Sequence, residues 1–229
     1  MLSTPYSETI GALLHLSTKT RPEIAHSVSV LARYNSNPGK RHWNCVKQVL
    51  RYLKGTNTFG LVLGGDTLEL YGSVDANFAQ NPDNRKSYVG FMFKFGNGAI
   101  SSCSVSTKTV MTSSCETEIA AMFYGCSEAI WLRRLAASFG YCQSDPTLIL
   151  GDNQGALKWS NNCESNGRMK HINCKFFFVR ERITTKEIKT GFIPSTASPS
   201  DILTKSLPPK TFRSHRATFG IFPHSTESG

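Results

Sequence analysis

The sequence lacks the residue clusters that would point to a zinc site, to secretion or to a membrane. Its seven Cys and six His never come together at the spacing of zinc ligands, and no two Cys form a Cys-x-x-Cys pair. No apolar run approaches the ~20 residues needed to span a bilayer. The first residues, MLSTPYSETIG, have neither the basic region nor the apolar stretch of a secretory signal. We therefore expect an intracellular protein, cytoplasmic or nuclear and not secreted, with reduced Cys and no membrane partner.

Acidic residues are also scarce. The 229 residues include 16 Asp and Glu against 26 Lys and Arg, which gives a net charge of +10. This balance favours a polyanionic partner such as nucleic acid, although a solvated basic surface explains it equally well. The apolar fraction of 39%, with 14 Phe, suffices for a core, and the charged fraction of 18% is too low for a disordered chain. The length fits one large domain, or one domain plus an extension.

The spacing of apolar residues changes from helical to strand-like after the first 60 residues. Residues 6–54 predict three helices, with Ser7 capping the first, Pro22 in the first turn of the second and Gly55 closing the third. The string TNTFGLVLGGDT forms the junction between this helical part and the rest of the chain. We therefore expect a small helical segment in front of a larger domain.

The larger domain is predicted to have the order β-β-β-α-β-α-α-β-α. The string SYVGFMFKFGNGAISSCSV predicts a hairpin that turns at Asn97-Gly98, because both positions tolerate positive φ. Ser113 and Glu116 fit a capping box at the start of a long helix. Pro199 opens a final helix over SDILTKSL. This order indicates an α/β fold.

Four acidic residues lie at the edges of different apolar segments. In chain order they stand within a strand, near the start of the long helix, after a buried strand and in the final helix: Asp75, Glu118, Asp152 and Asp201. Each alone has an ordinary explanation, as a cap, a turn residue or a charge that compensates a helix dipole. Their order, however, is the one in which an RNase H-type fold gathers acids around two divalent metals, and all four would lie at one end of a single sheet.

Carboxylates grouped in this way suit the metal-dependent hydrolysis of a phosphodiester. Asp75, in a predicted central strand, is costly to bury unless it is paired or bound to metal. Two divalent ions ~3.5–4 Å apart can activate a water and stabilise the leaving alkoxide. Mg²⁺ takes oxygen ligands rather than Cys or His. Selection of RNA over DNA would depend on contacts with the 2′-hydroxyl.

Several strings, in this order, resemble the C-terminal end of the Pol polyprotein of Ty1/copia-type LTR retrotransposons. YSETIGALLHLSTKTRPEIAHSVSVLARY and HWNCVKQVLRYLKGT are similar to the segment after the reverse transcriptase palm. SVDANFAQNPDNRKSYVGFMF, TSSCETEIAA, LILGDNQGAL, RMKHINCKFFFVRE and SPSDILTKSL are similar to successive blocks of the RNase H domain. The resemblance covers about residues 6–221. It implies an RNase H-like mixed sheet flanked by helices and preceded by a small helical segment.

The domains expected on this basis are a helical reverse transcriptase thumb- or connection-like remnant, an RNase H-like domain and a disordered tail, at residues 1–60, 61–222 and 223–229. The implied activity is endonucleolytic hydrolysis of the RNA strand in an RNA–DNA hybrid. The rest of a Pol polyprotein would be a further partner.

The family's catalytic and metal-binding acids carry over to Asp75, Glu118, Asp152 and Asp201, with two Mg²⁺ or Mn²⁺ ions as cofactors. Glu118 is preferred to Glu116 because the family's Glu precedes an apolar-apolar-Ala run, as Glu118 does here. Asp75 would bridge both ions. Glu118 and Asp152 would hold one ion and orient the attacking water, and Asp201 would hold the other.

Five basic residues are candidate contacts for nucleic acid: Arg85, Lys86, Arg168, Lys170 and His171. Arg85 and Lys86 are equally well explained as an ordinary turn before a strand. For His171, a position on the helix surface or half-buried in it explains the residue slightly better than catalysis. Lys and Arg within residues 40–54 would steer the nucleic acid.

The sequence also departs from the family pattern, at Asn77, Phe78, Ser102, Asn173 and Phe177. None of these departures removes a predicted metal ligand, but they support a second hypothesis, a catalytically inactive nucleic-acid-binding relic. The palm's acidic polymerase motif is absent, so polymerisation by this chain alone is excluded. In a third interpretation, the helices of residues 1–60 would contact another subunit through an apolar face left without its palm partner.

Overall fold

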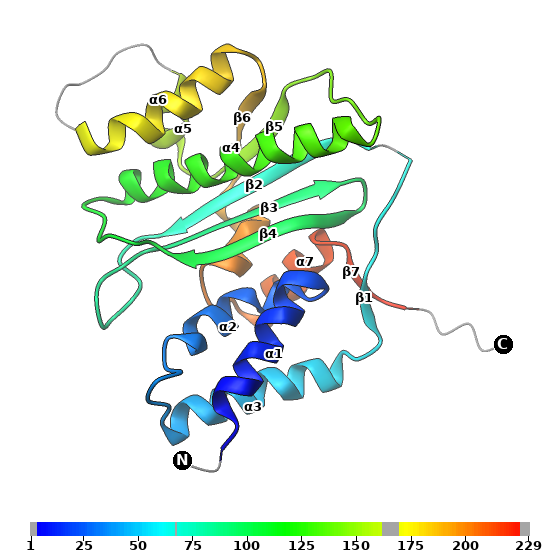
Figure 1. Cartoon of the computed structure of the whole chain (residues 1–229), viewed down its shortest axis with the longest axis vertical. Coiled ribbons are helices and arrows are strands. Elements are labelled where there is room, and N and C mark those ends of the chain that lie inside the picture. Colours follow the sequence, from blue (N-terminus) through cyan, green and yellow to red (C-terminus); the bar gives the residue numbers. More distant parts are fainter. Residues whose placement is uncertain (1–3, 67, 162–169, 225–229) are drawn as a thin grey trace.

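The structure, a computed structural model, describes residues 4–66, 68–161 and 170–224. Its centre is a five-stranded mixed sheet with the strand order β4-β3-β2-β5-β6 (Figure 1). The strands are β2 (Leu70–Asn77), β3 (Tyr88–Phe95), β4 (Gly98–Ser106), β5 (Thr147–Gly151) and β6 (Ile188–Phe192). The central strand β2 is antiparallel to β3 and parallel to β5. The mixed sheet, its flanking helices and the helical segment before it confirm the predicted fold class.

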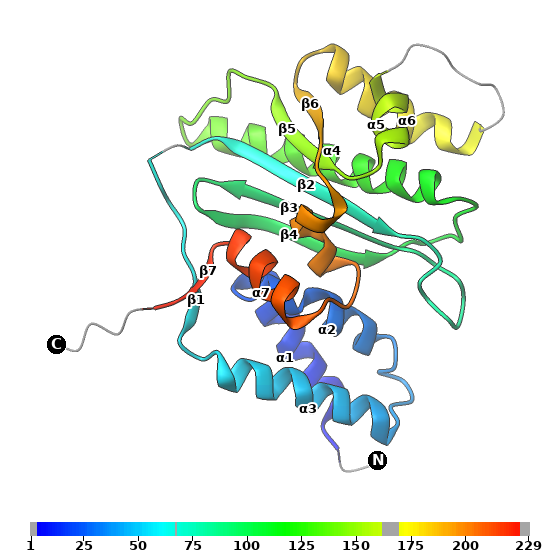
Figure 2. The ribbon, with the colours of Figure 1, turned by 180° about the vertical axis from the view of Figure 1, so that it is seen from behind.

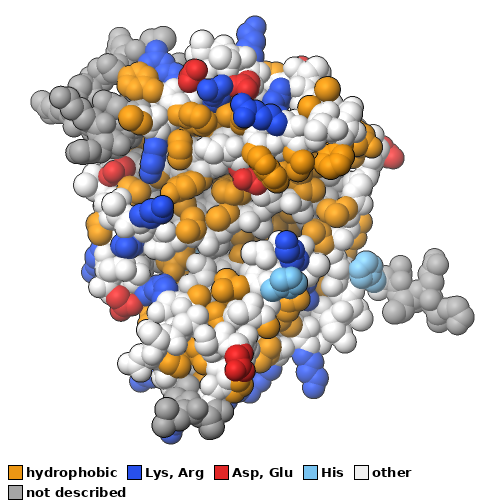
Figure 3. All heavy atoms as spheres, viewed as in Figure 1, with side chains coloured by type: hydrophobic (Ala, Val, Ile, Leu, Met, Phe, Trp, Pro, Cys, Tyr) orange, Lys and Arg blue, Asp and Glu red, His pale blue; other side chains and the backbone are white. Residues whose placement is uncertain are grey.

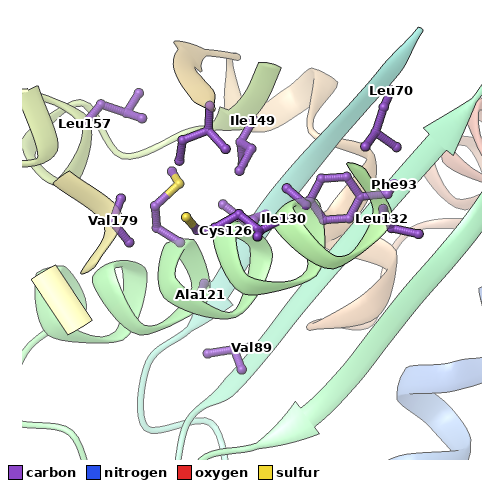
Figure 4. Close-up of a cluster of buried hydrophobic side chains, with 14 residues drawn as sticks. Leu70, Val89, Phe93, Ala121, Cys126, Ile130, Leu132, Ile149, Leu157 and Val179 are labelled. Carbon is purple, nitrogen blue, oxygen red and sulfur yellow. The ribbon is translucent and has the colours of Figure 1, made fainter. Parts of the chain in front are cut away.

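One face of the sheet packs against the long helix α4 (Ser114–Ser138), which α6 (Lys170–Thr184) and α5 (Gln154–Asn161) contact in turn. Alternate residues of the strands point to this face, because successive side chains of a strand point to opposite faces of the sheet. The core between the sheet and these helices is drawn in Figure 4 and includes Leu70, Val74, Val89, Phe93, Ala121, Cys126, Ile130, Ile149 and Val179. This layer fixes the start of α4 next to the end of the sheet.

The other face is covered by the 3₁₀ helix η3 (Pro199–Leu203) and by α7 (Pro209–Thr218), as Figure 2 shows from behind. Met92 of β3 packs here with Leu203 and Phe219. Gly90 lets η3 approach closely, because a Cβ at that position would lie 2.7 Å from the Cβ of Leu203. The segment after η3 is therefore held directly against the middle of β2 and β3.

The helical segment has the three predicted helices, α1 (Tyr6–Lys19), α2 (Ala25–Ala32) and α3 (Lys40–Gly55), and a core of its own. Pro22 opens a 3₁₀ turn that runs into α2. Helix α2 contacts both β4 and η3. The segment therefore packs on the sheet domain, on the side that η3 and α7 cover.

Three local features differ from their predictions: the cap of the first helix, the position of the hairpin turn and the final helix. Ser7 lies inside α1 and does not cap it. The hairpin turns at Gly96-Asn97, one residue earlier than predicted, because Gly96 takes the positive φ (74°) that glycine adopts at no steric cost. The final predicted helix is the short η3. The chain then restarts as α7 after Pro208, which has no N–H with which to continue a helix.

Two short strands, β1 (Phe59–Leu61) and β7 (Ile221–Pro223), pair antiparallel and bring the end of the helical segment next to the end of the sheet domain. No helix in the described part of the chain is long and apolar enough to cross a membrane. Arg168 and residues 225–229 of the predicted tail lie outside the described residues.

Candidate metal centre

The four predicted acids come from four elements that meet at one end of the sheet. Asp75 lies in β2, and Asp152 directly follows β5, the strand parallel to β2. Glu118 lies near the start of α4, and Asp201 lies in η3. Parallel neighbours end at the same edge of a sheet, which is why two of the acids lie close together although they are far apart in the sequence.

Three of the acids converge. Carboxylate oxygens of Asp75, Glu118 and Asp152 all lie within 4.8 Å of one another. Three oxygen donors at this separation are the ligand set that a hard divalent cation such as Mg²⁺ or Mn²⁺ takes. The donor set therefore fits the metal that the fold implies. Asp201 is not part of this group of three.

Asp75 is the most enclosed of the acids, with 1% of its surface exposed. Its Oδ2 accepts a hydrogen bond from the hydroxyl of Thr204, and its Oδ1 lies 3.5 Å from Nζ of Lys205. Burial raises the pKa of Asp75 to about 7, which Asp201 and Asp152 reinforce and Lys205 opposes. The raised pKa means that the ionised form of Asp75 is disfavoured in this position. A cation bound nearby would stabilise the ionised form.

The two glutamates at the start of α4 have different roles. The backbone N–H of Glu116 donates to Oγ of Ser113 over 3.1 Å, which is one of the two hydrogen bonds of the predicted capping box. The Glu116 carboxylate accepts from the backbone N–H of Thr112 over 2.6 Å and from the Thr112 hydroxyl over 2.8 Å. Glu116 therefore closes the helix start, and Glu118 turns to the metal centre. Burial, with Asp75 and then Asp152 nearby, raises the pKa of Glu118 to about 9.

Asp152 does not cap the helix that follows it. Asn153 does so, since its side-chain oxygen accepts from the backbone N–H of Ala156 over 3.0 Å. One oxygen of Asp152 instead accepts a 2.6 Å hydrogen bond from the hydroxyl of Ser195, in the segment before η3. The alternative explanation of Asp152 as a simple cap is therefore wrong.

Asp201, 7% exposed, shares a lysine with Asp75. Nζ of Lys205 is 3.0 Å from Oδ1 of Asp201 and 3.5 Å from Oδ1 of Asp75, so the ammonium group contacts both acids. Burial raises the pKa of Asp201, and Lys205 opposes that shift. Burial would lower the pKa of Lys205, but Asp75 and Asp201 outweigh it, so the pKa is raised.

Thr204 and Lys205 were missed by sequence reasoning. Both stand in the string SDILTKSL directly after Asp201. The available signal was the spacing of Asp201 and Lys205, four residues apart, which places opposite charges together on a helical turn.

The described residues among the predicted nucleic-acid contacts lie in two separate places, the loop between β2 and β3 and the start of α6. Arg85 is exposed and Lys86 half-buried in the loop between β2 and β3. This loop is held from the helical segment, because Arg33 donates over 2.6 Å to Oδ1 of Asn81 and over 2.6 Å to Oδ2 of Asp83. Lys170 and His171 lie in the first turn of α6.

Some departures from the family pattern have a visible role. The side-chain amide of Asn77 donates to the carbonyl of Thr204 over 3.2 Å and so helps to hold the segment after η3. Phe78 and Phe177 are exposed.

The sequence is similar to curated retrotransposon proteins. It is 38% identical over 221 residues, 96% of the chain, to the retrovirus-related Pol polyprotein from transposon TNT 1-94 of Nicotiana tabacum. It is 33% identical over 219 residues, 95% of the chain, to the corresponding polyprotein from transposon RE2 of Arabidopsis thaliana. The matched parts are 17% and 15% of those polyproteins, so the chain spans about a sixth of their length. No protein-family model matches the sequence.

Among solved structures, RNase H1 from the halophilic archaeon Halobacterium salinarum NRC-1 is similar with a TM-score of 0.41 and 17% identity, covering 59% of this chain and 94% of that one. LC11-RNase H1 in complex with an RNA/DNA hybrid is similar with a TM-score of 0.43 and 10% identity, again over 59% of this chain and 94% of that one.

Proposed function

The chain belongs to the copia-type retrotransposon Pol polyproteins, and from this we propose that it is an RNase H-type endoribonuclease that hydrolyses the RNA strand of an RNA–DNA hybrid. The observation that carries the proposal is the convergence of Asp75, Glu118 and Asp152 from three separate elements. Bringing three carboxyl groups together, one of them buried and two half-buried, is unfavourable unless a cation joins them. Such surplus charge in a cluster is typical of a functional site.

The residues divide the work as follows. Asp75, Glu118 and Asp152 would hold Mg²⁺ or Mn²⁺. A divalent ion held there supplies Lewis-acid stabilisation of the phosphate and an activated water. Ser195 fixes one carboxylate oxygen of Asp152, and Thr204 fixes one of Asp75, so the free oxygens keep their direction. In the two-ion form of the reaction, Asp75 would bridge the ions and Asp201 would hold the second.

The partner we propose is the hybrid itself. Arg85 and Lys86 lie in the loop that follows the strand of Asp75, and we propose that they contact the phosphates of the hybrid. Figure 3 shows basic side chains over both the helical segment and the elements above the sheet. Phosphate neutralisation by such residues supplies affinity, and 2′-hydroxyl contacts would select the RNA strand. The rest of a Pol polyprotein is a further proposed partner.

The test is a hybrid-cleavage assay with Mg²⁺ or Mn²⁺ and with chelator. Wild type should cleave only with metal, and Asp75→Asn should not cleave at all, because an amide is a poor substitute for a carboxylate ligand. Asp145→Asn, an exposed acid away from the centre, is the matched control and should cleave normally. Mn²⁺ should also raise the melting temperature of wild type and not of Asp75→Asn. A fully active Asp75→Asn protein contradicts the proposal.

The second candidate is an inactive nucleic-acid-binding relic. It is favoured by the departures at Asn77, the last residue of the strand of Asp75, and at Phe78, which directly follows that strand. Hybrid binding without cleavage, together with no Mn²⁺ effect on melting, would select it. The third interpretation, in which residues 1–60 contact another subunit, predicts association that gel filtration at several concentrations detects. The packing of α2 on β4 and η3 uses part of that surface within the chain.

A further inference from the structure

A lysine side chain lies against the two acids that the two-ion prediction assigns to the second metal ion. The ammonium group of Lys205 lies 3.5 Å from Oδ1 of Asp75 and 3.0 Å from Oδ1 of Asp201. Asp75 and Asp201 are the two acids that would hold the second ion in the two-ion prediction. Lys205 is half-buried, so solvent and substrate reach the ammonium group from one side.

The lysine is held in place by the fold. The backbone N–H of Lys205 donates to the carbonyl of Asp201 over 3.0 Å, which closes the turn after η3. The preceding residue, Thr204, is fully buried, and its hydroxyl donates to Asp75. On the strand side, Gly90 pairs with Asp75 and leaves room for Leu203 to pack directly on the sheet. Moving the ammonium group away from Asp75 would therefore leave two buried carboxyl groups facing each other.

The ammonium group of Lys205 and a second divalent ion cannot both lie against Asp75 and Asp201, because they would overlap and repel each other. A divalent ion bound to both Asp75 and Asp201 would lie about 2 Å from each oxygen, within the space that Nζ occupies. A positive charge and a doubly positive charge that close repel strongly in a site of low dielectric. The carboxylates of Asp75, Glu118 and Asp152 still offer oxygens within 4.8 Å of one another, which is a ligand set for a single ion.

We propose that the ammonium group of Lys205 is the resident cation of the second position, so that the chain binds one divalent ion rather than two. The inference rests on the proposed nuclease function. In this arrangement the single positive charge of Lys205 offsets part of the negative charge of Asp75 and Asp201. Asp201 is then a positioning residue for Lys205, which revises its predicted role as a metal ligand.

The experiment counts Mn²⁺ ions bound per chain, by calorimetry and by electron paramagnetic resonance of free Mn²⁺. Wild type should bind one ion. Lys205→Met should bind two, because the methionine removes the positive charge and its thioether is too soft to replace an oxygen ligand of Mn²⁺. Lys205→Arg should bind one, since the charge is kept. Lys189→Met, at an exposed position of β6 away from the acids, is the matched control and should also bind one.

Two ions bound to wild type, or one ion still bound to Lys205→Met, would overturn the inference. The wild-type count needs no variant, so it decides the question even if Lys205→Met does not fold. Hybrid cleavage by a wild-type chain with two ions would leave the nuclease function standing and remove only the role of Lys205. A wild type that binds no ion and does not cleave would overturn both.

Discussion

The molecule contains two clusters of charged side chains that both join distant segments of the chain. They differ in net charge. In the helical segment, Nε of Arg21 lies 2.7 Å from Oε1 of Glu23, and both side chains are buried. Tyr52 donates to the same oxygen over 3.1 Å, and Arg21 donates to the hydroxyl of Thr56 over 2.6 Å. One positive charge meets one negative charge. The pair ties the turn before α2 to the end of α3.

At the end of the sheet, the described side chains place one lysine against an excess of acids. Lys205 contacts both Asp75 and Asp201, and Glu118 and Asp152 add two further carboxyl groups. Burial and mutual repulsion raise the pKa values there, to about 7 for Asp75 and about 9 for Glu118. The Arg21–Glu23 pair has no surplus charge, and its structural role in joining the turn before α2 to the end of α3 is sufficient to explain it. A cluster with surplus negative charge is unfavourable for the metal-free fold, and this points to a cation as its purpose.

The largest effect should come from removing one acid of the unbalanced cluster. Glu118→Gln should lower hybrid cleavage by about 10³-fold or more, because the loss of a metal ligand forfeits several kcal/mol of transition-state stabilisation. Glu116→Gln is the matched control, two residues away on the same helix, and should keep its cleavage rate within a few-fold. Single-turnover cleavage at saturating Mg²⁺ measures both. Equal losses in the two variants would mean that the start of α4, and not the metal centre, is what the reaction needs.

Substitution within the Arg21–Glu23 pair should lower the stability of the fold and should not change the mechanism of cleavage. Glu23→Ala leaves the guanidinium of Arg21 buried without its counter-charge, and should lower the free energy of unfolding by about 3–5 kcal/mol. Urea denaturation measures this, with the exposed Glu8→Ala as control, expected within about 0.5 kcal/mol of wild type.

The double variant Arg21→Met/Glu23→Leu should recover much of the loss, because it removes both charges together. If Glu23→Ala were as stable as wild type, Arg21 and Glu23 would not be a structural pair.

The two clusters were not equally visible in the sequence. The acids could be found because each stands at the edge of a different apolar segment, and the order of those segments places them at one end of a sheet. The capping box predicted for Ser113 and Glu116, together with the resemblance, separated Glu118 from Glu116, and the hydrogen bonds from Thr112 to Glu116 supply the physical reason. The role of Lys205 could not be read, because it depends on η3 docking against a strand more than a hundred residues earlier in the chain.

The same limit explains the local errors. Whether SDILTKSL forms an α-helix or a short 3₁₀ turn is decided by contacts of Leu203 and Thr204 with Gly90 and Asp75, which local propensity does not contain. The hairpin turn was displaced because Gly96 competes with Asn97 for the positive φ, and glycine carries no steric penalty there.

A smaller effect, on stability, should distinguish the metal-free from the metal-bound centre. The folded-state pKa of Glu118, about 9, lies above its value of ~4.3 in an unfolded chain. The protonated carboxyl therefore stabilises the fold fully below about pH 4, and this contribution is lost as the pH rises through 9. Gln cannot ionise, so without metal Glu118→Gln should melt about 5 °C above wild type at pH 8 and at the same temperature as wild type at pH 4.

Differential scanning calorimetry across this range, with chelator and then with Mn²⁺, measures the difference. Mn²⁺ should reverse the order at pH 8, because only wild type keeps all three ligands. A Glu118→Gln protein that melts below wild type at pH 8 without metal would show that Glu118 is a favourable structural group, as Glu23 is.

The smallest effect should come from Arg33, which joins the two regions. Arg33 holds Asn81 and Asp83 in the loop that carries Arg85 and Lys86, so Arg33→Ala should loosen that loop without touching the acids. Exposed ion pairs contribute at most about 1 kcal/mol, so the fold should survive. We expect KM for the hybrid to rise about three- to tenfold while kcat changes less than twofold, because the looser loop weakens binding and leaves the metal centre intact. Arg213→Ala, an exposed residue of α7, is the control and should leave both constants unchanged. A fall in kcat with unchanged KM would place the effect of Arg33 in the metal centre, and the helical segment would then support catalysis and not substrate binding.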